Sequence, residues 1–128
     1  MASYESIQNR PKTLIVDVDG TIFRQTGKWP DIDTIDPKKD ILPGVREKFI
    51  EWNMKGYRIV LMTGRADNYR ALTEDQLQKG GIPYHHLIMG ASMGQRVLIN
   101  NLKLEEPDVP TAVAVNLEID QGFQGMDI

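Results

Sequence analysis

The sequence predicts a single α/β domain in which helices and a mainly parallel sheet form three layers. A chain of 128 residues fits one domain. Short apolar runs that resemble buried strands alternate along it with longer amphipathic segments that resemble helices. With 41% hydrophobic and 26% charged residues, the composition is that of an ordinary globular protein. The alternation of strands and helices favours a Rossmann-like, layered α/β/α fold with five strands.

The first strand is predicted at 13–16, after an N-terminal tail at 1–11. Its residues are apolar and β-branched and stop abruptly at Asp17, as in a strand buried on both faces of a parallel sheet. The segment 22–42 contains two prolines, a glycine and several aspartates, which predicts a loop.

The remaining elements alternate regularly. Val45, Phe49 and Trp52 lie on one face of a predicted helix that Pro43 begins and Gly56 ends. The predicted elements in order are a helix at 43–55, a strand at 57–62, a helix at 66–79 and strands at 87–89, 97–99 and 111–117. The domain is therefore expected to span 12–117, with a C-terminal tail at 118–128.

Composition excludes several classes of protein. The absence of cysteine excludes a disulfide scaffold, a thiol nucleophile and a cysteine zinc site. No apolar run approaches the roughly 18 residues of a membrane span, and the polar segment 1–10 lacks the apolar core of a signal peptide. We therefore expect a cytoplasmic protein without a membrane partner. A net charge of −3 argues against a dedicated nucleic-acid binder but permits a small phosphorylated substrate.

Polar residues follow the predicted strands, where ligands bind in parallel sheets. Asp17 and Asp19 leave the first strand two residues apart, and Gly20 permits a bend that would bring them together. Two adjacent carboxylates favour a cation between them, and their oxygens suit Mg²⁺. A carboxylate can attack a phosphoryl group, and a second can protonate the leaving oxygen and later activate water.

The apolar strand followed by DVDGTI resembles the first signature of the haloacid dehalogenase-like superfamily in its phosphatase form. YRIVLMTGR, from Tyr57 to Arg65, resembles the second signature. The resemblance implies an HAD-like phosphatase fold with Mg²⁺ as cofactor. It implies that Asp17 is the nucleophile and Asp19 the general acid/base, and that Thr63 and Gly64 bind the phosphoryl group.

Two positions depart from the superfamily pattern. The signature that completes the metal site normally supplies aspartates, whereas this chain has Asn100-Asn101. The metal set is then Asp17, Asp19 and Asn100, with weakened metal affinity, unless the asparagines only form a turn. The lysine expected to stabilise the phosphorylated aspartate is replaced by Ala91, so Arg96 is the preferred substitute, ahead of Lys103 and Lys79.

Only 21 residues stand between Thr21 and Pro43, too few for the cap domain that many superfamily members insert there. A capless site is open, which suits a bulky substrate or closure by a neighbouring subunit in a homo-oligomer. The chain is similar to small capless phosphatases that are found near capsule and sugar-biosynthesis genes, and more faintly to polynucleotide 3′-phosphatase domains. We expect a small phosphomonoester as substrate, with a nucleic-acid 3′-phosphate as the less favoured option.

Other interpretations remain open. The acidic pair and Thr63-Gly64 could be ordinary loop and capping residues, and His85-His86 on an extended segment would point to opposite faces. The alternative function is a catalytically weakened relative that binds a phosphorylated ligand or a partner protein. A receiver-like domain phosphorylated on Asp17 fits the motifs less well.

Overall fold

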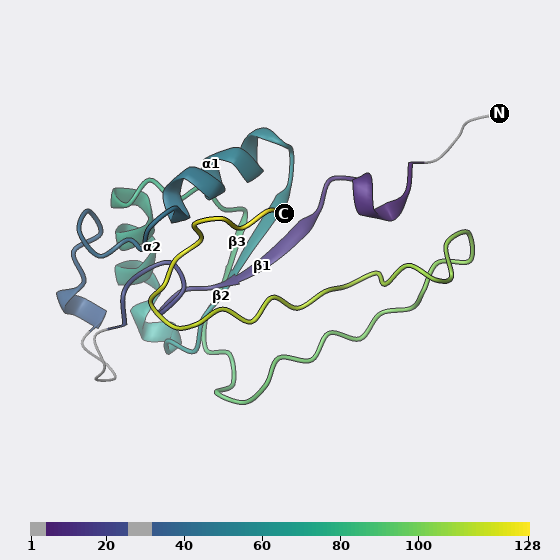
Figure 1. The fold of residues 1–128 in the computed structure, drawn as a ribbon. Helices are drawn as coiled ribbons and strands as arrows, with labels where there is room; N and C mark the ends of the chain where they lie inside the picture. Colours follow the sequence, from purple (N-terminus) through teal and green to yellow (C-terminus); the bar gives the residue numbers. More distant parts are fainter. Residues whose placement is uncertain (1–4, 26–31) are drawn as a thin grey trace.

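The centre of the molecule is a parallel sheet of three strands. The structure, a computed structural model, describes residues 5–25 and 32–128. Within them the strands are β1 (Thr13–Asp17), β2 (Arg58–Met62) and β3 (His86–Ile88), and β2 lies in the middle (Figure 1). Asp17 pairs with Met62 and Met62 with Ile88, so the carboxyl ends of all three strands lie at one edge. We call this the carboxyl edge.

Two α-helices connect the strands. α1 (Val45–Met54) lies between β1 and β2, and α2 (Arg70–Lys79) lies between β2 and β3, directly after the 3-10 helix η3 (Asp67–Tyr69). Each is within a few residues of its predicted position. Two further 3-10 turns are η1 (Ile7–Asn9) and η2 (Ile32–Thr34). None of the described helices is long and apolar enough to cross a bilayer.

Both helices cover the same face of the sheet. The strands are ordered as in the sequence, and right-handed crossovers in one direction place successive helices on one face. Alternate strand residues face this layer and join the core with Val45, Phe49 and Trp52, as predicted for that helix. The buried strand residues of this core are Val16, Ile59, Leu61 and Leu87.

The C-terminal segment completes the core. Phe123 is buried, and its ring lies 6.1 Å from that of Phe49 and 5.6 Å from that of Trp52, centroid to centroid. Its backbone N–H donates to the carbonyl of Pro43 at 2.8 Å. Phe123, together with the partly buried Met126 and Ile128, therefore makes the C-terminal segment part of the folded body.

The opposite face of the sheet is uncovered. Ile15 is 50% exposed and Ile88 is 42% exposed, and Val60 and Met62 between them are only partly buried. We call these four residues the open face. The described part of the chain thus has two layers instead of the predicted three.

The predicted fourth and fifth strands do not form within the single chain. Residues 92–118, which we call the arm, run out from the body and back (Figure 1). The segment 97–99 cannot become a parallel neighbour of β1, because only eight residues (89–96) separate it from β3. A parallel crossover requires about a dozen or more.

The arm is anchored at its two ends and at its tip. It begins where Ala91 donates to the carbonyl of Thr63 at 2.9 Å, and it ends where Asp120 donates to the carbonyl of Gly20 at 2.9 Å. At the tip, the Glu106 carboxylate accepts from Ser6 Oγ at 2.7 Å and from the backbone N–H of Ile7 at 2.8 Å. The outgoing leg therefore runs antiparallel to β1, from the carboxyl edge toward η1.

Candidate active site

The carboxyl edge brings together the residues that follow β1 and β2. Asp17 ends β1, and Thr63 follows Met62, the partner of Asp17 in the ladder. Thr63 is buried and its N–H donates to the carbonyl of Ile88 at 2.9 Å. Its hydroxyl oxygen accepts from the backbone N–H of Arg65 at 3.1 Å. The hydroxyl proton can still be donated toward the edge.

Asp17 is the accessible carboxylate of the site. The residue is exposed, although neighbouring atoms partly desolvate its carboxyl group. This desolvation is the largest influence and raises the pKa of Asp17 above its ordinary value of 3.8, and the nearby charge of Asp19 raises it further. The backbone N–H of Val18, which donates to Asp17 Oδ1 at 2.9 Å, and the charge of Arg96 act in the opposite direction.

Asp19 is held by a buried arginine. The Arg65 side chain has no solvent exposure, and its guanidinium donates to both Asp19 oxygens, from Nε at 2.9 Å and from Nη2 at 2.7 Å. This is the two-point geometry that a guanidinium forms with a carboxylate. The pair joins the loop after β1 to the loop after β2.

Helix α2 fixes the arginine from behind. Arg65 Nη1 donates to Thr73 Oγ1 at 2.9 Å and to Gln76 Oε1 at 2.7 Å. The Thr73 hydroxyl donates to the carbonyl of Tyr69, and the Gln76 amide donates to the carbonyl of Ile32 at 2.6 Å. Every buried polar group of this network therefore has a partner, which fixes the orientation of the guanidinium.

Arg65 is the last residue of the YRIVLMTGR motif, and the sequence alone predicts no role for it. The available signal was its position directly after Thr63-Gly64 at a strand end. The spacing of Thr73 and Gln76, three apart on α2, would also have placed two polar side chains on one face. The sequence spacing also places Tyr69, Leu72 and Leu77 on roughly one side of the helix predicted at 66–79. Of these three, Leu77 is fully buried and Tyr69 is 37% exposed.

The chain bends at Gly20, as predicted. Gly20 has φ of +81°, a conformation that glycine adopts without a steric cost. The carbonyl of Val18 accepts from the N–H of Ile22 at 2.8 Å, and the N–H of Gly20 donates to the carbonyl of Phe23 at 2.7 Å. Val18, Ile22 and Phe23 are fully buried, so the bend that presents Asp17 and Asp19 rests on the core.

The other predicted site residues lie toward the arm. Gly64 faces Met93, because a Cβ added at Gly64 would lie 2.7 Å from the methionine sulfur. Arg96 is exposed near the start of the arm, and its charge reaches Asp17. Asn100 and Asn101 are exposed farther along the outgoing leg. Among the described residues, no hydrogen bond joins the side chains of Asn100 and Asn101 to Asp17 or Asp19; the carbonyl of Asn101 instead accepts from Thr111.

The donor set suits a magnesium ion held by few protein ligands. The described residues contain no group of three histidine, aspartate or glutamate side chains that could hold a metal. Mg²⁺ commonly binds through one or two carboxylates, substrate phosphate and water. Asp17 can supply such a carboxylate, whereas both Asp19 oxygens already accept from Arg65.

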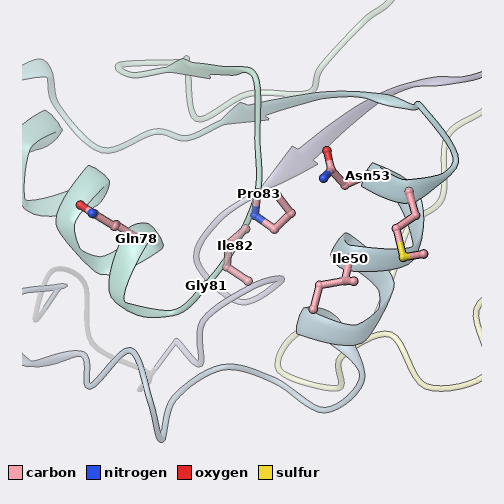
Figure 2. A pocket seen from close by; sticks show the side chains of 7 residues that line it. Ile50, Asn53, Gln78, Gly81, Ile82 and Pro83 are labelled. Carbon is pink, nitrogen blue, oxygen red and sulfur yellow. The ribbon is translucent and has the colours of Figure 1, made fainter.

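A separate hollow lies between α1 and α2 and is not part of this edge. Its volume is about 440 Å³, and Figure 2 shows it lined by Ile50 and Asn53 from α1 and by Gln78 and Ile82 from the end of α2 and the turn that follows. These helix ends lead into the starts of β2 and β3. The hollow therefore lies at the amino ends of the strands, away from Asp17.

Comparisons with known proteins identify the family of the chain. A solved structure from Vibrio cholerae is 23% identical, with a TM-score of 0.48, and the alignment covers 77% of this chain and 94% of that one. No curated protein matches. Residues 11–101, more than half of the chain, match the family model of the polynucleotide kinase PNKP phosphatase domain. The chain therefore belongs to this phosphatase-domain family, within the haloacid dehalogenase-like superfamily.

Proposed function

We propose that the protein hydrolyses phosphomonoesters through an aspartyl-phosphate on Asp17. The observation that carries the proposal is the difference between two neighbouring carboxylates. Asp17 is exposed at the end of β1, as a nucleophile must be, whereas Asp19 is held at both oxygens by Arg65. Membership of a phosphatase-domain family supports the same chemistry.

In the first step a carboxylate oxygen of Asp17 attacks phosphorus, and the bond from phosphorus to the ester oxygen breaks. Asp19 donates a proton to the departing oxygen, which leaves as an alcohol. The fork from Arg65 leaves each Asp19 oxygen a further lone pair, so one oxygen can carry this proton. Arg65 is thus a positioning residue that fixes where the acid stands.

In the second step water attacks the phosphorus of the aspartyl-phosphate. Asp19, now ionised, takes a proton from the water, and the bond from phosphorus to the Asp17 oxygen breaks. Inorganic phosphate leaves, and both carboxyl groups return to their starting states. The loop at Gly20 holds the two residues in this relation throughout, because its buried side chains keep it in place.

The phosphoryl oxygens need donors in this open site. We assign them to the Thr63 hydroxyl, the Gly64 backbone N–H and Arg96, whose charge already reaches Asp17. Mg²⁺, bound by Asp17 with Asp19 and Asn100 as further candidates, would neutralise charge between the nucleophile and the phosphoryl group. Since phosphoryl transfer depends mainly on positioning and charge stabilisation, these contacts account for most of the expected catalysis.

The substrate is proposed to be a small or sterically exposed phosphomonoester. A net charge of −3 argues against a dedicated nucleic-acid binder, so a sugar phosphate or a similar small ester is the first class to test. The family match makes the 3′-phosphate end of a polynucleotide the second substrate to test. The two classes differ in charge, and therefore in the salt dependence that hydrolysis should show.

The test is phosphate release by the purified full chain from p-nitrophenyl phosphate, sugar phosphates and a 3′-phosphorylated oligonucleotide, over a range of Mg²⁺ concentrations. We expect release that depends on Mg²⁺ and disappears in Asp17→Asn. Glu47→Gln, which removes a carboxylate from the first turn of α1, is the matched control and should retain activity. Activity that survives Asp17→Asn would contradict the assigned nucleophile.

One observation favours a second candidate, binding without turnover. The described residues lack a third carboxylate for the metal, and Arg65 already neutralises Asp19. A protein that only binds would show saturable, Asp17-dependent binding of a phosphorylated ligand in calorimetry and no phosphate release. Asn100→Asp separates the two candidates, because the added carboxylate should tighten Mg²⁺ binding and preserve or raise turnover only in an enzyme.

A further inference from the structure

The chain exposes more surface than a compact monomer of its mass. A folded monomer of 14.5 kDa is expected to expose about 6,900 Å². This chain exposes 8776 Å². The excess is about 1,900 Å² per copy, so two copies that buried it would form an interface of about 3,800 Å² in total, within the range of obligate homodimers.

Much of the apolar surface lies in two places. One is the open face of the sheet, where Ile15 and Ile88 are about half exposed. The other is the arm, whose exposed apolar side chains are Met93, Val97, Leu98, Ile99, Leu102, Leu104, Val113, Val115 and Leu117. Monomeric proteins rarely expose contiguous apolar patches beyond a few hundred Å², so both surfaces indicate an interface.

The backbone shows the same incomplete pairing. β1 has β2 on one side, and no strand of the described chain pairs with its other edge. Among the described residues, no backbone–backbone hydrogen bond involves 92–102 or 110–119. The two legs are joined instead by a side chain, Thr111 Oγ1 donating to the carbonyl of Asn101 at 2.8 Å. A free strand edge and unpaired extended segments of β-branched sequence are suited to pair with each other.

The arm cannot pair with the free edge of β1 in its own chain. The eight residues from β3 to Val97 are too few for a parallel crossover. The hydrogen bonds of Glu106 to Ser6 and Ile7 also hold the tip beyond the start of β1. The arm of another copy can approach this edge, because the short connection after β3 does not limit how two chains approach each other.

We propose that two copies of this chain form a dimer by exchanging arms. The arm of each copy lies along the free edge of β1 and over the open face of the other, so the same two surfaces meet twice, as a two-fold axis requires. The segments 97–99 and 111–117 then become sheet strands that no single chain contains. This inference concerns assembly. Because Arg96 and Asn100 lie in the arm, it bears on the contacts proposed for these two residues, but not on the roles proposed for Asp17 and Asp19.

The first test is the mass of the full chain in solution, measured by light scattering during size-exclusion chromatography. We expect twice the chain mass of 14.5 kDa at micromolar concentration. A single-chain mass across the accessible concentrations would overturn the proposal.

Charge substitutions then locate the interface. Ile99→Glu on the arm and Ile15→Glu on the open face should each shift the protein to the monomer. Both side chains are already at least half exposed in the single chain, so a charge there is compatible with the folded monomer. Met54→Glu, at an 82% exposed position on α1, which covers the opposite face of the sheet, is the matched control and should remain dimeric. A dimer that survives both test substitutions would contradict arm exchange, and circular dichroism verifies that each variant is folded.

Cross-linking distinguishes exchange from simple contact between two open faces. The chain has no cysteine, so introduced thiols are the only ones present. Ile15→Cys and Ile99→Cys chains, mixed after denaturation and refolded together, should give a cross-linked dimer containing one chain of each kind with a short bis-maleimide. Met54→Cys mixed with Ile99→Cys should not. Cross-linking of Ile15→Cys only to itself would support face-to-face contact and overturn the exchange.

Discussion

The buried Arg65 and the acidic Asp19, 46 residues apart in the chain, form a two-point ion pair at 2.7 and 2.9 Å. The pair lies between the loop that carries the nucleophile and the helix that follows β2. Its position links the stability of the fold to the geometry of the site, because the same contact serves both.

Replacing the arginine tests the structural side of this link. Arg65→Met keeps the apolar stem and removes the charge, which leaves Asp19 and Gln76 without their partner. Loss of one partner of a buried pair costs about 3–5 kcal/mol, and we expect a decrease of that size in the free energy of unfolding from urea titration. Lys79→Met is the control, because its ion pair with Asp75 is more than half exposed and should contribute about 0.3–0.5 kcal/mol. Equal effects of the two substitutions would contradict the special role of Arg65.

Replacing the aspartate tests the chemical side. Asp19→Asn keeps the shape and removes the transferable proton, so we expect turnover of an alkyl phosphate to fall by about 10²–10⁴-fold. p-Nitrophenolate leaves without needing a proton, so the first step with p-nitrophenyl phosphate should be less affected. The measurement is the ratio of kcat/KM for the two substrates in wild type and variant. An unchanged ratio would exclude Asp19 as the acid.

The ionisation of Asp17 should make the free energy of unfolding depend on pH. Partial burial raises the pKa of its carboxyl group above 3.8, so the folded protein holds this proton more tightly than the unfolded chain. The resulting stability is present below pH 3.8 and is lost as the pH rises through the folded pKa. Asp17→Asn cannot ionise and should be more stable than wild type near neutral pH.

This advantage should shrink as the pH falls toward 3.8, where the wild-type carboxyl group is also protonated. Thermal unfolding of both proteins across that range measures it. A difference in melting temperature that does not vary with pH would show that ionisation is not its cause.

The C-terminal segment can be tested through its buried aromatic residue. Phe123 is 2% exposed and stacks against Phe49, so Phe123→Ala should cost about 3–5 kcal/mol of unfolding free energy in urea titration. Gln124→Ala, next to it and exposed, should change stability by less than about 0.5 kcal/mol. If the two variants were equally stable, the segment would not be part of the core.

The first three strands and both helices could be predicted because their signals are local. The apolar run before Asp17 and the spacing of Val45, Phe49 and Trp52 depend only on neighbouring residues. The segments 97–99 and 111–117 carry the same local signal, yet they remain unpaired in the single chain. Whether a strand forms depends on an available neighbour, and the short connection after β3 denies them one.

The site was predictable to a similar extent. The alignment of strand ends follows from a parallel sheet, so Asp17 and Thr63 were expected at one edge, and the structure places them there. The role of Arg65 was not predictable, because its partners come from three separate segments. Asp19, Thr73 and the Gln76–Ile32 contact meet only once the chain is folded.

The hydrogen bonds of Asp120 connect the C-terminal segment to the loop of the candidate active site. The backbone N–H of Asp120 donates to the carbonyl of Gly20, and its carboxylate accepts from the N–H of Gln25 at 2.7 Å. A residue beyond the arm therefore holds the loop that carries Asp17 and Asp19. The family match ends at residue 101, before this fastening and before Phe123. A fragment that ends at residue 101 would contain both signature motifs, but it would lack the contacts of Asp120 and Phe123. We therefore expect the unit that folds on its own to extend beyond residue 101, where the family match ends.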